Sequence, residues 1–118
     1  MVLNLDDAAT PANFLVAYHD GTNATLLKCV AGTYTSVITA VAAYAANKTM
    51  RVVKDGTSVS LFYNGAKVGT TQTVSDAGII SNTLHGLFST YASNILDNFS
   101  VFPRGNGSEY SKLDKWIK

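Results

Sequence analysis

Apolar and polar residues alternate in the middle of the chain. In the segment 58–63, Val59, Leu61 and Tyr63 fall on one face, while Phe62 shares the other face with two serines. A period of two is typical of a β-strand that buries one of its faces. The pattern therefore predicts a strand whose core residues are the first three and whose outward aromatic residue is Phe62.

Two tight turns flank this strand. Asp55-Gly56-Thr57 precedes it and Asn64-Gly65 follows it. Asp, Asn and Gly tolerate the positive φ angles that a two-residue hairpin turn requires. We therefore expect a meander of three antiparallel strands at the centre of the protein, over residues 50–54, 58–63 and 67–72.

Other segments that are rich in β-branched and aromatic residues predict more strands. They are residues 2–5, 13–20, 24–30, 33–41, 84–91 and 94–102. The alanine-rich run 42–46 is too short to nucleate a helix, so we expect extended or irregular chain there, and we expect a loop over 73–81. Strand follows strand without interleaved helices, which favours an all-β fold of the antiparallel β-sandwich or jelly-roll type.

The last residues of the sequence differ in character. Leu113, Trp116 and Ile117 have helical spacing among lysines and acids, which predicts a short helical tail. Because 118 residues leave room for a single core, we expect one domain over 1–105 and a C-terminal tail over 106–118.

Composition narrows the classes of protein. Apolar residues make up 47% of the chain and charged residues 14%, which is typical of a folded domain. The net charge is +1 and neither sign is clustered, which argues against nucleic-acid binding. No apolar run reaches the roughly 18 residues of a membrane span, and the first residues lack the basic and apolar regions of a signal peptide. The single cysteine, Cys29, cannot form an internal disulfide, and we expect it to be a small buried residue.

Several short segments, taken in order, resemble one known superfamily. They are Phe14 to Asn23, Lys28 to Tyr34, Met50 to Gly56, Tyr63 to Gly65, Gly86 to Phe88 and Asp97 to Phe99. Together they resemble the concanavalin A-like lectin/glucanase superfamily, and most of all its laminin-G-like jelly-roll modules in bacterial and phage surface proteins. The resemblance covers residues 12–102 and implies a jelly-roll β-sandwich in an extracellular, cell-surface or virion protein.

Related modules carry further strands before the segment equivalent to Phe14 to Asp20, and this sequence has almost nothing there. The resemblance therefore implies either a minimal sandwich or strands supplied by another chain. Because an exposed sheet edge pairs readily with another strand, we expect a homo-oligomer or an assembly with another protein chain.

The carboxylates argue against glycosidase activity. A glycosidase needs two carboxylates that flank the scissile bond, and the hydrolases of the resembled superfamily carry them on one strand as Glu-x-Asp-x-Glu. This chain has one glutamate, Glu109, and its aspartates fall mostly in predicted turns. His19 and His85 stand in no Ser/His/Asp or His-x-x-x-His pattern. We therefore expect a protein without catalytic activity, and no cofactor other than calcium.

Asp20, Asn23 and Asp97 are candidate calcium ligands. Their oxygens are hard donors in or near predicted turns, and modules of the resembled kind often hold calcium there. The alternative is that Asp20 to Asn23 is an ordinary turn, stabilised by hydrogen bonds between side chain and backbone. The sequence leaves both interpretations open.

Tyr34, Phe62 and Arg51 are candidates for one carbohydrate-binding surface. Exposed aromatic rings pack against pyranose rings, and polar groups at the rim bind the sugar hydroxyls. The alternative is that the aromatic residues fill the core, since strands favour them. We expect a non-catalytic carbohydrate-binding or adhesion module. The rival is a structural component of a viral or extracellular assembly, such as a decoration or tail-associated protein, without a sugar site.

Overall fold

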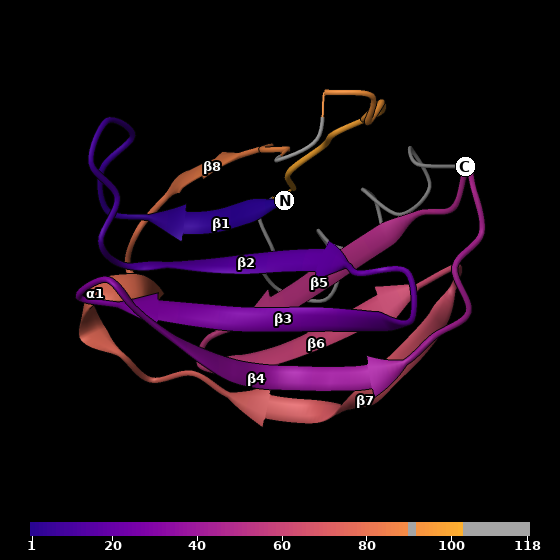
Figure 1. Cartoon of the computed structure of the whole chain (residues 1–118). Helices are drawn as coiled ribbons and strands as arrows, with labels where there is room; N and C mark the ends of the chain where they lie inside the picture. Colours follow the sequence, from indigo (N-terminus) through magenta and orange to yellow (C-terminus); the bar gives the residue numbers. More distant parts are fainter. Residues whose placement is uncertain (90–91, 103–118) are drawn as a thin grey trace. The chain divides into compact units, whose positions relative to one another are not determined.

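The computed structural model describes residues 1–89 and 92–102, and the chain divides into two units, Met1–Phe88 and Ser89–Lys118. All the strands and the one helix of the described residues lie in the first unit (Figure 1). Their bounds are β1 Val2–Leu5, β2 Phe14–His19, β3 Asn23–Val30, β4 Thr33–Val41, β5 Met50–Asp55, β6 Ser58–Tyr63, β7 Ala66–Thr73, α1 Ala77–Ile80 and β8 Leu84–Gly86.

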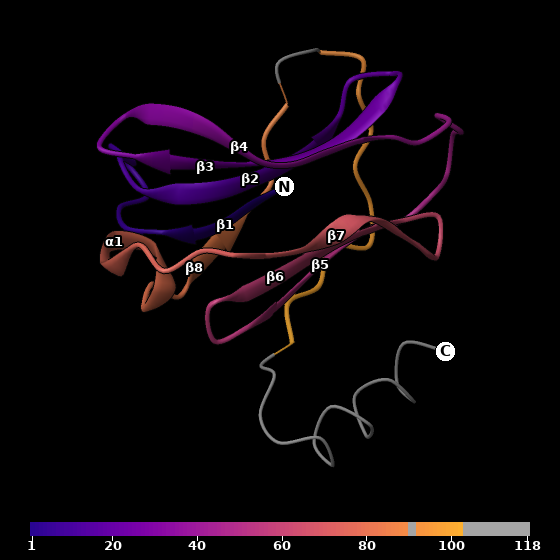
Figure 2. The same ribbon diagram turned by 90° about the horizontal axis from the view of Figure 1, so that it is seen from below.

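The strands form two antiparallel sheets, one of five strands in the order β4-β3-β2-β1-β8 and one of three strands in the order β5-β6-β7. Figure 2 shows the two sheets as two layers. Side chains from both layers form one core, in which Leu15 and Leu26 of the first sheet meet Val59 and Leu61 of the second. All four are fully buried. The structure is thus mostly β, with two antiparallel sheets and one short helix, and the predicted central meander is confirmed.

A second, smaller apolar cluster lies on the other face of the five-stranded sheet. Phe14, Val16 and Cys29 are buried there, on positions that alternate with the residues of the main core. The predicted burial of Cys29 is confirmed. β2 is thus apolar on both of its faces, which is typical of a central strand.

The strand predictions for residues 1–73 agree with the structure to within one residue at each end, and 2–5, 33–41 and 58–63 agree at both ends. The Asn64-Gly65 turn is confirmed, with φ angles of 53° and 81°. Of the predicted turn Asp55-Gly56-Thr57, Asp55 pairs with Ser58 and ends β5, so Gly56 and Thr57 form the two-residue loop.

Three predictions near the end of the described chain are wrong. Of the strand predicted over 84–91, the described residues form it only over Leu84–Gly86, and residues 90–91 lie outside the described part; no strand is formed over 94–102. Phe99 and Val101 do alternate with polar residues, yet both remain more than one third exposed. Alternation alone does not make a strand, because the backbone also needs a partner for its hydrogen bonds. The third is the loop predicted over 73–81, which contains the one-turn helix α1. The tail predicted over 106–118 lies outside the described residues.

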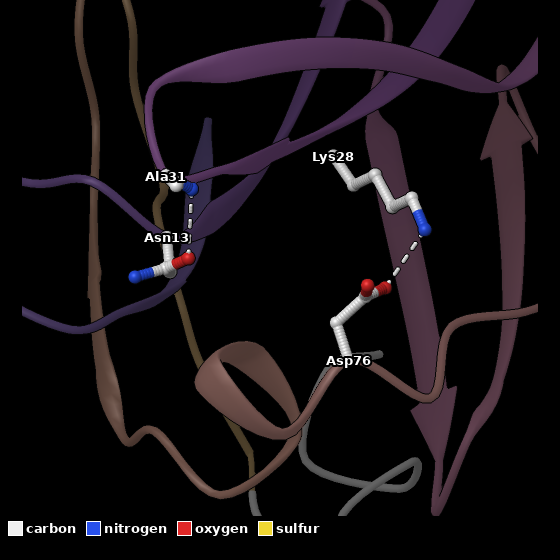
Figure 3. A network of polar contacts seen from close by, with 4 residues as sticks. All are labelled: Asn13, Lys28, Ala31 and Asp76. Atoms are coloured by element: carbon white, nitrogen blue, oxygen red, sulfur yellow. Dashed lines mark hydrogen bonds and ion pairs between the residues drawn. The ribbon is translucent and has the colours of Figure 1, made fainter.

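α1 closes one end of the core. Its Ile79 is fully buried, and the carbonyl of Ile80 accepts a hydrogen bond from Lys54 Nζ at 3.1 Å. Lys28 extends from the core side of β3, and its ammonium lies 2.8 Å from Asp76, directly before α1 (Figure 3). Both lysines thus reach out of the core and bind the segment that covers it. None of the described residues forms a helix that is long and apolar enough to cross a membrane.

A reciprocal amide pair accompanies the contact between β1 and β8. Asn4 Nδ2 donates to the Asn82 carbonyl at 2.7 Å, and Asn82 Nδ2 donates to the Asn4 carbonyl at 3.1 Å. The backbone N–H of Asn4 also donates to His85 Nδ1 at 3.3 Å. The chain thereby returns from the three-stranded sheet to the edge of the five-stranded one.

The loop between β1 and β2 is held by two aspartates. Asp6 accepts hydrogen bonds from the side-chain amide of Asn13 at 2.7 Å and from the backbone N–H of Ala12 at 3.0 Å, which lowers the pKa of Asp6 to about 2. Asp7 accepts from the backbone N–H groups of Thr10 and Ala9, which lowers its pKa as well. Asn13 also accepts a hydrogen bond from Ala31 at 3.0 Å, so the loop is tied to the β3–β4 turn (Figure 3).

These pKa values predict an acid-sensitive stability. An aspartate whose pKa is lowered by folding stabilises the folded state above its unfolded pKa of about 4. That contribution is lost as the pH falls from about 4 through the folded pKa of Asp6, about 2. We expect the urea midpoint to fall over this window, and to fall less steeply in the Asp6→Asn variant, whose amide oxygen still accepts from Asn13. An identical pH profile for the variant and the natural sequence would contradict this.

Candidate functional site

The outward face of the three-stranded sheet carries a row of three side chains. The strand register places Arg51, Phe62 and Lys67 opposite one another on β5, β6 and β7. Each of them is next in sequence to residues of the core, so the row points away from it. Two of the three predicted ligand-binding residues, Phe62 and Arg51, therefore lie side by side.

Arg51 and Phe62 form a cation–π contact. The guanidinium carbon lies 4.5 Å from the centre of the Phe62 ring, a distance at which the ring quadrupole attracts the cation. Arg51 is exposed and Phe62 is half-buried. The contact holds a charged donor group over one face of the half-buried ring.

Two hydroxyl groups lie beside this row. Ser60 Oγ and Thr71 Oγ1 are 2.7 Å apart, and Lys67 Nζ donates to Thr71 Oγ1 at 2.6 Å. The register places Thr71 here because β7 bulges: its residues 69–71 all lie opposite Ser60 alone. We call the five residues of this surface, Arg51, Ser60, Phe62, Lys67 and Thr71, the sheet patch.

The sheet patch carries positive charge. Within the part of the chain that the structure describes, one ion pair is formed, between Lys28 and Asp76. Neither Arg51 nor Lys67 has a carboxylate partner among those residues. The patch thus offers two cationic groups, two hydroxyl groups and one aromatic ring, which together can bind a polar ligand that also has an apolar face.

Tyr34, the third predicted ligand-binding residue, lies elsewhere. It stands on β4 opposite Cys29, and its ring meets Phe14 edge-to-face with a centroid distance of 5.9 Å. It therefore belongs to the outward face of the five-stranded sheet, although it is 59% exposed as expected. The prediction of a single surface for Tyr34, Phe62 and Arg51 is wrong, because the two sheets direct these residues to opposite sides of the core.

Of the predicted calcium ligands, Asp20 and Asn23 lie in the first unit and form the turn between β2 and β3, whereas Asp97 lies in the second unit. Asp20 accepts hydrogen bonds from the backbone N–H groups of Asn23 and Thr22, at 2.7 and 2.8 Å, and from the Asn23 amide. The hydrogen bond from the Asn23 backbone contributes most to lowering the pKa of Asp20. Asp97 belongs to the second unit and accepts from the Asn98 N–H. Among the described residues, no three His, Cys, Asp or Glu side chains form a group that could hold a metal ion. The ordinary-turn interpretation accounts for each hydrogen bond at Asp20.

Both histidines act as hydrogen-bond partners within the fold. His19 Nδ1 accepts from the Gly21 N–H at 2.9 Å, so Nε2 is the donor to the Ala42 carbonyl at 2.8 Å. Its ring centroid lies 4.7 Å from that of the buried Tyr63. His85 accepts from Asn4, and its pKa is lowered by burial and by the nearby charge of Lys54. These contacts assign a structural role to both rings.

Sequence reasoning did not find Lys67, Ser60 and Thr71 as parts of the patch. The register of the two-residue turn was a usable signal for Lys67, since it places residue 67 opposite 62. The bulge that brings Thr71 to Ser60 has only Gly69 as its signal, with a φ of 66°.

Sequence reasoning also did not find two hollows between the edge strands β4 and β7. One of about 160 Å³ is lined by residues that include Ile38 and Thr70, and one of about 320 Å³ by residues that include Val41 and Lys67. Gly69 lines both. No buried side-chain polar atom of the described residues lacks a hydrogen-bond partner, so none points unsatisfied into these hollows.

A scan against protein-family models, a search of curated proteins and a search of solved structures each found no match. A function is therefore inferred from the fold and the sheet patch alone.

Proposed function

We propose that this protein is a non-catalytic carbohydrate-binding or adhesion module and that it binds saccharides on the sheet patch. The observation that carries the proposal is the row Arg51–Phe62–Lys67 across three adjacent strands, with the Ser60–Thr71 hydroxyl pair beside it. A sheet surface that carries one aromatic ring among several hydrogen-bonding groups suits a sugar.

The chemistry of the patch matches the two kinds of surface on a pyranose. The C–H groups of the sugar ring can pack on the half-buried ring of Phe62, and dispersion with an aromatic face gives area at little entropic cost. The sugar hydroxyl groups can accept from Arg51 and Lys67, and can exchange hydrogen bonds with Ser60 and Thr71.

We also propose that the two sheets form a sandwich of the jelly-roll type found in concanavalin A-like modules. Two observations support this: the sheets are antiparallel and share one core, and the chain returns from β7 through α1 to β8 at the edge of the other sheet. A module of this kind would act outside the cell, on a cell surface or on a virion.

The proposal predicts that Phe62→Ala weakens saccharide binding about tenfold or more, because the apolar platform is lost. Binding is found first with a glycan array and is then measured by calorimetry on the ligand identified. Tyr34→Ala is the matched control, since it removes an exposed aromatic ring from the opposite sheet and should leave the affinity unchanged.

Two results would contradict the proposal. One is the absence of binding by the natural sequence to any saccharide at millimolar concentration. The other is an equal affinity for the Phe62 and Tyr34 variants, with both proteins folded by circular dichroism. Either result would favour the rival function, a structural component of a viral or extracellular assembly. The free edge of β4, described next, is the observation in favour of that rival.

A further inference from the structure

β4 is a free sheet edge. It stands at the end of the five-stranded sheet and pairs only with β3. Its nine residues make it the longest strand of the described chain. Most of its side chains are exposed, and Val41 is 80% exposed. An unpaired strand of this length presents a row of N–H and C=O groups to any strand that approaches.

The hydrogen bonds to β3 show which backbone groups are unpaired. Ala42 N–H donates to the Thr22 carbonyl at 3.0 Å, and hydrogen-bonded pairs recur at every second residue of an antiparallel ladder. Ile38 and Ala40 are therefore bonded to β3. Thr39 and Val41 lie between the bonded positions, so their N–H and C=O groups point toward the free edge.

In the first half of β4, every second residue likewise has its backbone groups unpaired, but there these are the even-numbered residues. Val30 pairs with Thr33 across a two-residue turn, and in such a hairpin this is a hydrogen-bonded pair. The N–H and C=O groups of Tyr34 and Ser36 therefore also point outward. A bulge at Val37 separates the two halves and reverses the phase between them.

The composition of the edge distinguishes β4 from the others. Charged residues and prolines commonly keep a sheet edge from pairing with another strand. Residues 33–41 contain neither. By contrast, the edge strand β5 carries Arg51, Lys54 and Asp55, and the edge strand β7 carries Lys67. The remaining edge, β8, has only three residues.

We infer that β4 pairs antiparallel with β4 of a second copy of this chain, so that the five-stranded sheets of the two copies become one continuous sheet. A second copy is the occupant that fits, because an uncharged strand meets an equally uncharged strand across a two-fold axis. A charged partner strand would find no opposite charge on this edge. The inference is independent of the proposed saccharide site, which lies on the other sheet.

The contact is small. Outward groups from four residues of each copy form it, and interfaces below about 1,200 Å² belong to weak or transient complexes. We therefore expect an association that depends on concentration, with monomer at low micromolar and dimer toward millimolar protein.

Amide hydrogen exchange tests the inference without a mutation. At millimolar concentration the amides of Tyr34, Ser36, Thr39 and Val41 should exchange slowly, and at low micromolar concentration they should exchange fast. The amides of Ile38 and Ala40, which are bonded to β3, should be protected at both concentrations. Fast exchange of the four outward amides at millimolar concentration overturns the inference, even if the protein self-associates by another surface.

The paired variant Thr39→Lys/Val41→Lys provides a second test by sedimentation velocity. Lysines on both copies would face each other across the edge, and we expect the dissociation constant of the dimer to rise about tenfold or more. The control Ala8→Lys/Thr10→Lys adds the same charge in an exposed loop and should leave the constant unchanged. Equal association of the two variants overturns the inference. The Phe62→Ala variant should still dimerise. Loss of saccharide binding can therefore be distinguished from loss of pairing through β4.

Discussion

Replacing Leu61 by alanine is expected to lower the free energy of unfolding by about 2–5 kcal/mol. Leu61 is fully buried on β6, in the cluster to which both sheets contribute. Truncation would remove apolar contacts and leave a cavity between two layers that cannot close over it. Urea unfolding followed by circular dichroism measures the change, which should lower the midpoint while the m-value stays the same.

Leu84→Ala is the matched control for this experiment. Leu84 lies on the short strand β8 and is 46% exposed. Its truncation should cost less than about 1 kcal/mol, since surface substitutions have small effects. If the two variants unfold at the same urea concentration, Leu61 does not lie in a core shared by the two sheets.

Gly69→Ala is expected to destabilise the protein by about 2–4 kcal/mol, from two additive causes. Gly69 has a φ of 66°, a left-handed conformation that costs an L-residue about 1–2 kcal/mol. A Cβ placed on it would also lie 2.9 Å from Cγ2 of Ile38, so β4 and β7 would have to move apart. The same urea experiment measures the loss.

Gly65→Ala separates the two causes. Gly65 has a φ of 81°, but a Cβ there would have no neighbouring atom within 4 Å. Its substitution should therefore cost only the conformational part, about 1–2 kcal/mol. Equal losses at positions 65 and 69 would show that the close approach of β7 to Ile38 does not limit packing. In an Ile38→Ala background, the loss at Gly69 should shrink toward that at Gly65.

Strands and hairpin turns could be predicted because their signals are local. The alternation of Val59, Leu61 and Tyr63 identified the buried face of β6, and all three are buried. Asn64-Gly65 fixed one turn and hence the register of its neighbours. Errors arose where the structure depends on a distant partner. Phe99 and Val101 stand on one face of a predicted strand that residues 94–102 do not form, and β8 stops after three residues.

In the candidate site, too, the residues placed by local signals could be predicted and those placed by distant contacts could not. Arg51 and Phe62 lie on one hairpin. The alternation of side chains along its two strands and the position of one turn were enough to place them on the same face. Tyr34 lies on β4, and the sheet that β4 joins is decided by packing between residues far apart in sequence. Thr71 reaches the patch through a bulge whose position no periodic pattern indicates. For the same reason, the free edge of β4 follows from the strand order and not from the sequence of β4.

The pairing of β1 with β8 has a consequence for the order of folding. The hairpins β2–β3, β3–β4, β5–β6 and β6–β7 each join neighbouring segments, whereas the Asn4–Asn82 amide pair joins residues 78 positions apart. Closing so long a loop costs chain entropy that a four-residue strand and a three-residue strand cannot repay alone. β1 also pairs with its neighbour β2 across the loop that Asp6 and Asp7 hold, so β8 gains free energy from pairing only when β1 and β2 are already in place. We therefore expect β8 to pair after the two meanders have formed and to be released before them.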